Sequence, residues 1–203
     1  ACHAQGAYPL AYYPHNYHFL AATATLEGNS ALAWQAAKKM QQLSEEDIMR
    51  LPGWGTLQHY YTIPYNVAVK FAMWDTILAL PAPAKDLVYP NAIWLYAKGM
   101  AHAGKNDMKK AEKDLDELTV LAKDTILQHL TIWDINTTSD IVQIAAKVLA
   151  AQIAAKKNDM DKSIALLNEA VAIEDNLNYN EPPDWFFSVR HYVGAALLKA
   201  GKY

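Results

Sequence analysis

The sequence predicts an all-α fold: an irregular array of antiparallel helical hairpins forming one domain over residues 1–203. Long stretches place apolar residues three or four positions apart, which makes one face of a helix apolar and leaves the other solvated. Period-two alternation flanked by hairpin turns, the pattern of paired strands, is almost absent. A turn with similar surroundings also recurs four times, which indicates a repeated helical hairpin.

Capping residues and apolar periodicity delimit the predicted helices along the chain. Extra helices are expected between residues 43 and 83, where the spacing of the repeated turn is longest. Pro90 suits a first helical position and Gly104 a helix end, while Ser139 is a plausible N-cap. The later predicted helices cover residues 89–103, 107–127, 139–156, 159–175 and 185–200.

The repeated turn is surrounded by small residues at fixed distances. Small residues at these places allow two antiparallel helices to approach closely, as a helical hairpin requires. The turn residues are Gly28, Asn106, Asn158 and Gly201. The small residues seven positions earlier are Ala21, Gly99, Ala151 and Gly194, and those five positions later are Ala33, Ala111 and Ser163.

This pattern of small residue, turn and alanine resembles the tetratricopeptide repeat. Residues 99–118 and 151–170 carry it best, and the resemblance covers about two-thirds of the chain. Leu95 and Lys147 stand where the repeat usually has an aromatic residue, so these copies are degenerate. The resemblance implies a TPR-like α-solenoid with inserted helices.

Two further segments resemble a group of longer bacterial tetratricopeptide proteins of obscure function. These segments are residues 12–20, which contain two histidines and three tyrosines, and residues 181–185, which contain two adjacent prolines. In that group the repeat array starts before the position equivalent to Ala1 and continues beyond Tyr203. The resemblance therefore implies that this chain is the later part of a longer repeat array.

Composition restricts the functional classes. The chain has 18 Lys and Arg against 21 Asp and Glu, so it lacks the basic excess of a general nucleic-acid binder. Its single cysteine, Cys2, excludes an internal disulfide framework. No run approaches the roughly 20 apolar residues of a membrane span. The sequence does not indicate a cellular compartment.

The resemblance implies a non-enzymatic interaction module that binds a peptide, a protein partner or a neighbouring domain on a concave face, without a cofactor. Aromatic side chains with polar tips suit such a groove. Arg190 has the fork geometry to hold a carboxylate, although it could instead pair with Glu181 or Asp184. The candidate ligand-binding residues are Tyr13, His15, Asn16, His18, Tyr60, Trp185 and Arg190.

A metal-binding protein or metal-dependent enzyme on the same scaffold is the alternative hypothesis. If Pro14 opens a helix, His15 and His18 point to one side of it and begin a site for a divalent transition metal. His59 is a candidate third ligand, with Glu181 and His191 as others. In the structural interpretation, His15 instead makes hydrogen bonds near a helix start while His18 packs inside the array.

The sequence lacks the common catalytic and phosphate-binding motifs. The end of the chain suggests a third hypothesis, which is self-association. The sequence contains no Gly-rich phosphate loop, no Gly-x-Ser-x-Gly elbow and no His-Glu-x-x-His helix. The last predicted helix is followed by a turn but by no second helix. Its apolar face then needs another cover, so self-association through this incomplete C-terminal hairpin is expected as a further form of partnership.

Overall fold

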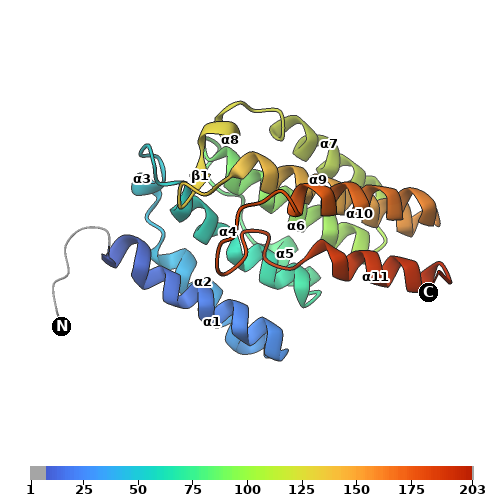
Figure 1. Cartoon of the computed structure of the whole chain (residues 1–203), viewed down its shortest axis with the longest axis horizontal. Coiled ribbons are helices and arrows are strands. Elements are labelled where there is room, and N and C mark those ends of the chain that lie inside the picture. Colours follow the sequence, from blue (N-terminus) through green and yellow to red (C-terminus); the bar gives the residue numbers. More distant parts are fainter. Residues whose placement is uncertain (1–7, 203) are drawn as a thin grey trace.

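The computed structural model describes residues 8–202 and confirms the all-α prediction (Figure 1). Cys2 lies outside the described residues. The elements in chain order are the π-helix η1 (Tyr8–Tyr12), α1 (Tyr13–Glu27), α2 (Ser30–Leu43), α3 (Glu46–Met49), α4 (Gly55–Lys70), α5 (Trp74–Ala79), α6 (Val88–Gly104), α7 (Met108–Leu121), α8 (Ile126–His129), β1 (Thr131–Ile132), β2 (Asn136–Thr137), α9 (Thr138–Lys156), α10 (Met160–Glu174) and α11 (Val189–Lys199).

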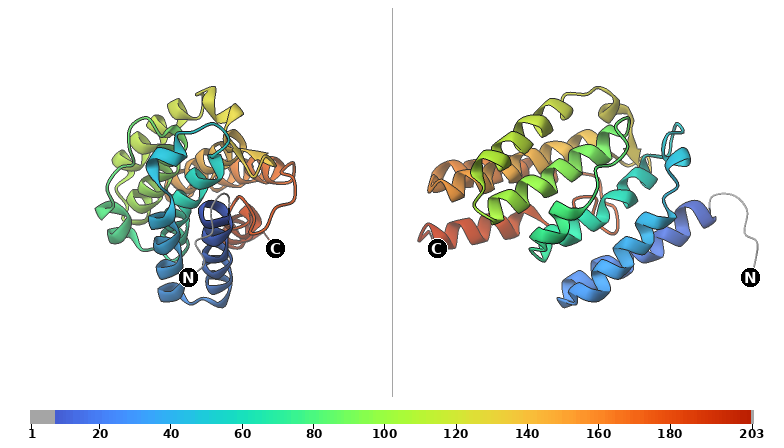
Figure 2. Two further views of the ribbon diagram at one scale, coloured as in Figure 1. Left: turned by 90° about the vertical axis from the view of Figure 1, so that its left-hand side faces the viewer. Right: turned by 180° about the vertical axis from the view of Figure 1, so that it is seen from behind.

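The helices stack as successive hairpins, α1/α2, α4/α5, α6/α7 and α9/α10, followed by α11 (Figure 2). Each second helix packs on its own first helix and on the first helix of the next hairpin. The first helices α1, α4, α6 and α9 also pack on one another in order. We call the side formed by α1, α4, α6, α9 and α11 the inner face. The helices expected between residues 43 and 83 thus include one more hairpin, α4/α5.

Each hairpin closes through a residue in the left-handed conformation. The N–H of the next residue donates to the carbonyl five positions before it, which satisfies a helix-end carbonyl. The five residues with this geometry and their φ angles are Gly28 (80°), Ala72 (52°), Asn106 (62°), Asn158 (64°) and Gly201 (69°). Four of these turns match the predicted ones. The turn at Ala72 was not predicted, because alanine rarely adopts this conformation.

The small residues around the turns are buried at contacts between helices, except Gly194, which is exposed with open space beside it. Ala21, Ala33 and Ala111 have no exposed surface, and Ser163 is 2% exposed. Gly99 allows α6 to approach α9 of the neighbouring hairpin, rather than the second helix of its own hairpin. A Cβ at this position would lie 2.4 Å from Leu149 Cδ2 on α9.

Two predicted helices have different bounds in the structure. The helix expected over residues 107–127 ends at Leu121, and Asp124 Oδ1 accepts the N–H of Ile126, which holds the chain in a local turn. The helix expected over residues 185–200 begins at Val189, because Trp185 turns into the core instead of continuing the helix.

A short antiparallel pair of strands, β1 and β2, was not expected from the sequence. It aligns Thr131 with Thr137 and Ile132 with Asn136. Each strand has two residues, too few for an alternating pattern to be visible. The pair positions Asn136 beside the start of α9.

The hydrophobic core has two parts. An N-terminal cluster joins α1, α2 and α4, and a central cluster joins α4, α6, α7, α9 and α10. The segment between α10 and α11 contributes to both, since Phe186 belongs to the N-terminal cluster and Trp185 to the central one. This segment therefore connects the first hairpin to the later ones.

Two helical glycines form a matched pair for a test of the packing. Gly99→Ala should destabilise the fold by about 1–3 kcal/mol, since the added methyl meets the buried Leu149. A Cβ added to Gly194 on α11 would have no atom within 4 Å, so Gly194→Ala should stabilise by about 0.5–1 kcal/mol through helix propensity. Urea unfolding of both variants measures these changes. Equal effects of the same sign would contradict the close approach at Gly99.

Candidate functional site

Three histidines and Tyr60 lie together on the inner face, where α1 meets α4. A proline, Pro14, stands in the first turn of α1, directly after the π-helix η1. One turn of this helix separates His15 from His18, whose ring centroids are 6.4 Å apart. His59 and Tyr60 come from α4, which packs on α1. The structure therefore brings together four of the residues singled out in the sequence.

His15 and His59 each use one ring nitrogen in a hydrogen bond with a tyrosine. The Tyr60 hydroxyl lies 3.2 Å from His15 Nδ1, and the Tyr89 hydroxyl lies 2.8 Å from His59 Nδ1. His18 lies beside His59, with ring centroids 5.5 Å apart. The Nε2 atoms of His18 and His59 are buried and have no hydrogen-bond partner within residues 8–202. Such unpartnered buried atoms cost about 1–3 kcal/mol each, so this pair is a locally unfavourable part of the core.

Burial keeps the paired rings neutral. It lowers the pKa of His18 well below its ordinary value of 6.5, and the neighbouring His59 and His15 lower it further. Burial also lowers the pKa of His59, against an opposing effect of the Asp184 carboxylate. Both imidazoles are therefore uncharged near neutral pH, the form in which histidine binds metals or accepts hydrogen bonds.

The segment joining α10 to α11, residues 175–188, crosses the inner face in front of α4 and α6 (Figure 1). We call it the covering segment. Its three consecutive aromatic residues each meet a first helix of a different hairpin or its end. The contacts are Phe186 with His18 on α1 (ring centroids 6.3 Å apart), Trp185 with Tyr96 on α6 (5.5 Å), and the Phe187 ring with Lys70 Nζ on α4 (3.1 Å).

One asparagine holds the covering segment by its backbone. The Asn136 side chain donates to the carbonyl of Asn178 at 2.9 Å and accepts the Asn178 N–H at 2.8 Å. The same Nδ2 donates to Asp184 Oδ2 at 2.7 Å, while Asn180 donates to the other oxygen of that carboxylate at 2.8 Å. The buried Asp184 is thus satisfied by neutral amides, which also stabilise the turn that positions Trp185.

The remaining sequence-predicted residues lie apart from the histidine cluster or have other contacts. Tyr13 and Asn16 are exposed on α1, and the Tyr13 hydroxyl bonds Tyr17. Trp185 is buried in the core and lines a cavity of about 250 Å³ formed largely by the covering segment itself. Arg190 is exposed and pairs with Asp175 at 2.7 Å, rather than with Glu181 or Asp184.

The structure places the three candidate metal ligands close together but does not arrange them as a metal site. His15, His18 and His59 are neighbours, yet no group of three or more His, Cys, Asp or Glu side chains among the described residues is arranged to hold a metal ion. The chemistry of neutral imidazoles still fits a transition metal, with two unpartnered nitrogens available.

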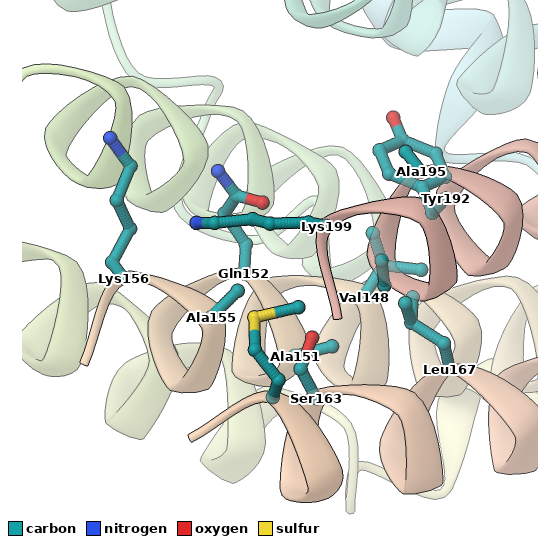
Figure 3. Close-up of a pocket in the computed structure, with 12 residues that line it drawn as sticks. Val148, Ala151, Gln152, Ala155, Lys156, Ser163, Leu167, Tyr192, Ala195 and Lys199 are labelled. Atoms are coloured by element: carbon teal, nitrogen blue, oxygen red, sulfur yellow. The ribbon is translucent and has the colours of Figure 1, made fainter. Parts of the chain in front are cut away.

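Beyond the covering segment, the inner face is open beside α11, and residues of α4, α5, α6, α9 and α10 also line this space. Two cavities of about 300 and 250 Å³ adjoin there and share Gln152, Tyr192 and Ala195. We call them together the open crevice. Figure 3 shows the second cavity, with Gln152 and Lys156 on α9 and Lys199 on α11.

The polar residues of this crevice do not stand out in the sequence. Its lysines are Lys70, Lys156 and Lys199. Each stands two positions before the left-handed residue of its turn, namely Ala72, Asn158 and Gly201. Aligning the predicted turns at Asn158 and Gly201 in the sequence would have revealed Lys156 and Lys199 at equivalent positions. Lys70 could not be found in this way, because the turn at Ala72 was not predicted.

Comparisons with protein-family models, curated proteins and solved structures found no match for this chain. Within residues 8–202, no helix combines the length and the apolar character needed to cross a membrane. The function therefore has to be inferred from the geometry of this chain.

The neutral histidine pair predicts a loss of stability in mild acid. The unfolded histidines bind protons below pH 6.5, whereas the folded ones resist protonation, so the free energy of unfolding should fall as pH drops below that value. The slope should approach about 1.4 kcal/mol per pH unit for each histidine. Urea unfolding between neutral pH and about pH 5 measures this dependence.

Two variants identify the source of that slope. His18→Phe should flatten the slope, leaving the contributions of His59 and His15, whose pKa values are also lowered by burial. It should also raise stability near neutral pH, because it removes one unpartnered nitrogen. His129→Gln, at an exposed position on α8, should leave the slope unchanged. An unaltered slope in His18→Phe would show that the buried pair is not responsible.

Proposed function

We propose that this chain is a non-enzymatic interaction module, similar to tetratricopeptide repeats, that binds an extended segment of a protein partner on its inner face. One observation carries the proposal: the inner face already holds a non-helical segment, namely residues 175–188 of the chain itself. Rings of that segment lie against α1, α4 and α6, and its backbone is held by a side-chain amide.

The covering segment illustrates the contacts that a partner would make. Asn136 engages both backbone groups of Asn178, a mode of recognition that requires no particular side chain on the bound strand. Aromatic residues then enter spaces between the first helices, where their burial supplies most of the favourable free energy. A partner segment would use the open crevice, where the face is not already covered.

Ala195 offers a direct way to block the crevice. It is exposed on α11 and lines both cavities, so Ala195→Trp fills the space without disturbing the core. Peptides selected from a random displayed library on the wild-type chain should lose at least about tenfold in affinity for this variant, equal to about 1.4 kcal/mol. Fluorescence anisotropy of the selected peptides measures the change.

Val120→Trp is the matched control for the blocking variant. Val120 is 69% exposed on α7, which belongs to the outer layer of second helices. Peptide affinity should be unchanged in this variant. The proposal is wrong if the library yields no binding peptide, or if both tryptophan variants weaken binding equally.

A metal-binding function is the second candidate, favoured by the two unpartnered Nε2 atoms of His18 and His59. On the interaction hypothesis, protein purified without chelators should retain no stoichiometric transition metal after exchange into metal-free buffer. Elemental analysis tests this expectation. Near-stoichiometric zinc, copper, nickel or iron that is lost in His15→Ala and in His18→Phe would instead favour the metal site.

Self-association through α11 remains a separate hypothesis from the sequence. On this helix Leu198 is 65% exposed, and Gly194 has open space beside it. These features leave an apolar strip available, but they do not identify what covers it.

A further inference from the structure

The charge of the open crevice is opposite in sign to that of the whole chain. Its walls carry Lys70, Lys156 and Lys199, and no Asp or Glu is among the residues that line either cavity. The chain as a whole has 21 acidic residues against 18 Lys and Arg. A cationic crevice on a net acidic protein is a local feature of this face, and it favours an anionic occupant.

These three lysines differ from most others in lacking an acidic partner. Seven of the other thirteen lysines form salt bridges, as Lys105 does with Asp75 at 2.6 Å. At the crevice, Lys156 donates to an amide oxygen, Lys70 lies over an aromatic ring, and Lys199 makes no salt bridge within residues 8–202. Their positive charges are thus not neutralised by carboxylates of the described chain.

The lysines also occupy equivalent positions at the ends of three helices, α4, α9 and α11. Each stands two residues before a left-handed turn, so the stacking of the array repeats them along one edge of the inner face. A lysine in the last turn of a helix is also favourable for that helix, because it complements the macrodipole. That effect accounts for the residue type but not for the lack of Asp and Glu among the residues that line the two cavities.

The floor of the crevice is apolar and contains one free amide. Trp74, Met100 and Val148 provide apolar surface, and Tyr192 lies between the two cavities. The Gln152 side chain makes no hydrogen bond within the described residues and is only half-buried. It offers a donor and an acceptor, the same pair that Asn136 uses on the backbone of the covering segment.

We propose that the open crevice binds an acidic polypeptide segment, in which carboxylates meet Lys70, Lys156 and Lys199 while apolar side chains between them enter the floor. This inference rests on the proposed function and specifies its partner. A nucleic acid fits less well, because the surrounding chain is net acidic and the three lysines lie along a crevice with an apolar floor.

Two pools of labelled random peptides test the charge of the partner. One pool has Glu at alternate positions and the other has Gln there, with the same mixture of apolar residues between them. In fluorescence anisotropy at low salt, the Glu pool should bind at least about tenfold more tightly than the Gln pool. This preference should decrease as salt is added, because exposed charges are screened.

Matched double variants test whether these lysines are responsible. Lys70→Gln with Lys199→Gln should reduce binding of the Glu pool about tenfold or more, and Lys70→Arg with Lys199→Arg should retain it. Lys109→Gln with Lys113→Gln changes the net charge equally at exposed positions of α7 and should have no effect. Circular dichroism establishes that each variant is folded.

The outcomes separate this inference from the proposed function. If both pools bind equally and Ala195→Trp weakens both, the interaction function stands and the acidic partner is wrong. If neither pool binds, both proposals fail. If single-stranded DNA competes as well as the Glu peptides, and both glutamine double variants weaken binding alike, the crevice is only part of a general polyanion surface and the inference is overturned.

Discussion

The burial of two neighbouring rings, Trp185 and Phe186, is the constraint on which the inner face depends. In arrays of helical hairpins, each unit ordinarily contacts only its neighbours along the chain. Here Phe186 lies in the N-terminal cluster with α1, while Trp185 packs on Tyr96 of α6 in the central cluster. The segment that follows α10 therefore ties the first hairpin to the later ones. This contact joins parts of the array that stacking alone would leave independent.

The same contact creates the environment of the histidines. Phe186 covers His18, and the two buried imidazoles then lose both water and charge. Their unpartnered Nε2 atoms are a cost that an all-apolar core would avoid. Buried polar groups of this kind are often part of functional sites, but here the covering segment separates them from solvent. An interaction partner would meet the other half of the inner face.

The inner face is thus divided into two halves of different chemistry. The covered half is aromatic and holds two neutral imidazoles and the buried Asp184, and Asn136 beside the start of α9 holds the backbone of the segment that fills it. The open half carries unpaired lysines at repeated positions, with Gln152 in the C-terminal half of the same helix. Asn136 in β2, just before α9, and Gln152 on α9 therefore present one amide toward each half. This arrangement supports the proposal that a second, acidic strand would lie where the first one ends.

The sequence by itself determined the features that depend on nearby residues. The all-α class follows from apolar periodicity, and the turns at Gly28, Asn106, Asn158 and Gly201 follow from residue types that tolerate positive φ. Their signals lie within one or two helical turns, so they can be read along the chain.

Tertiary structure decided the rest, because distant contacts outweigh local preference there. Ala72 has no turn signal, and its turn accompanies the packing of Trp74 against Gly104 on the next hairpin. Trp185 was expected to begin a helix, but burial of its ring holds it in the covering segment. Proximity of His59 to His18 likewise required α4 to pack on α1. The composition of the open crevice could not be read from spacing, because its walls come from helices far apart in the sequence.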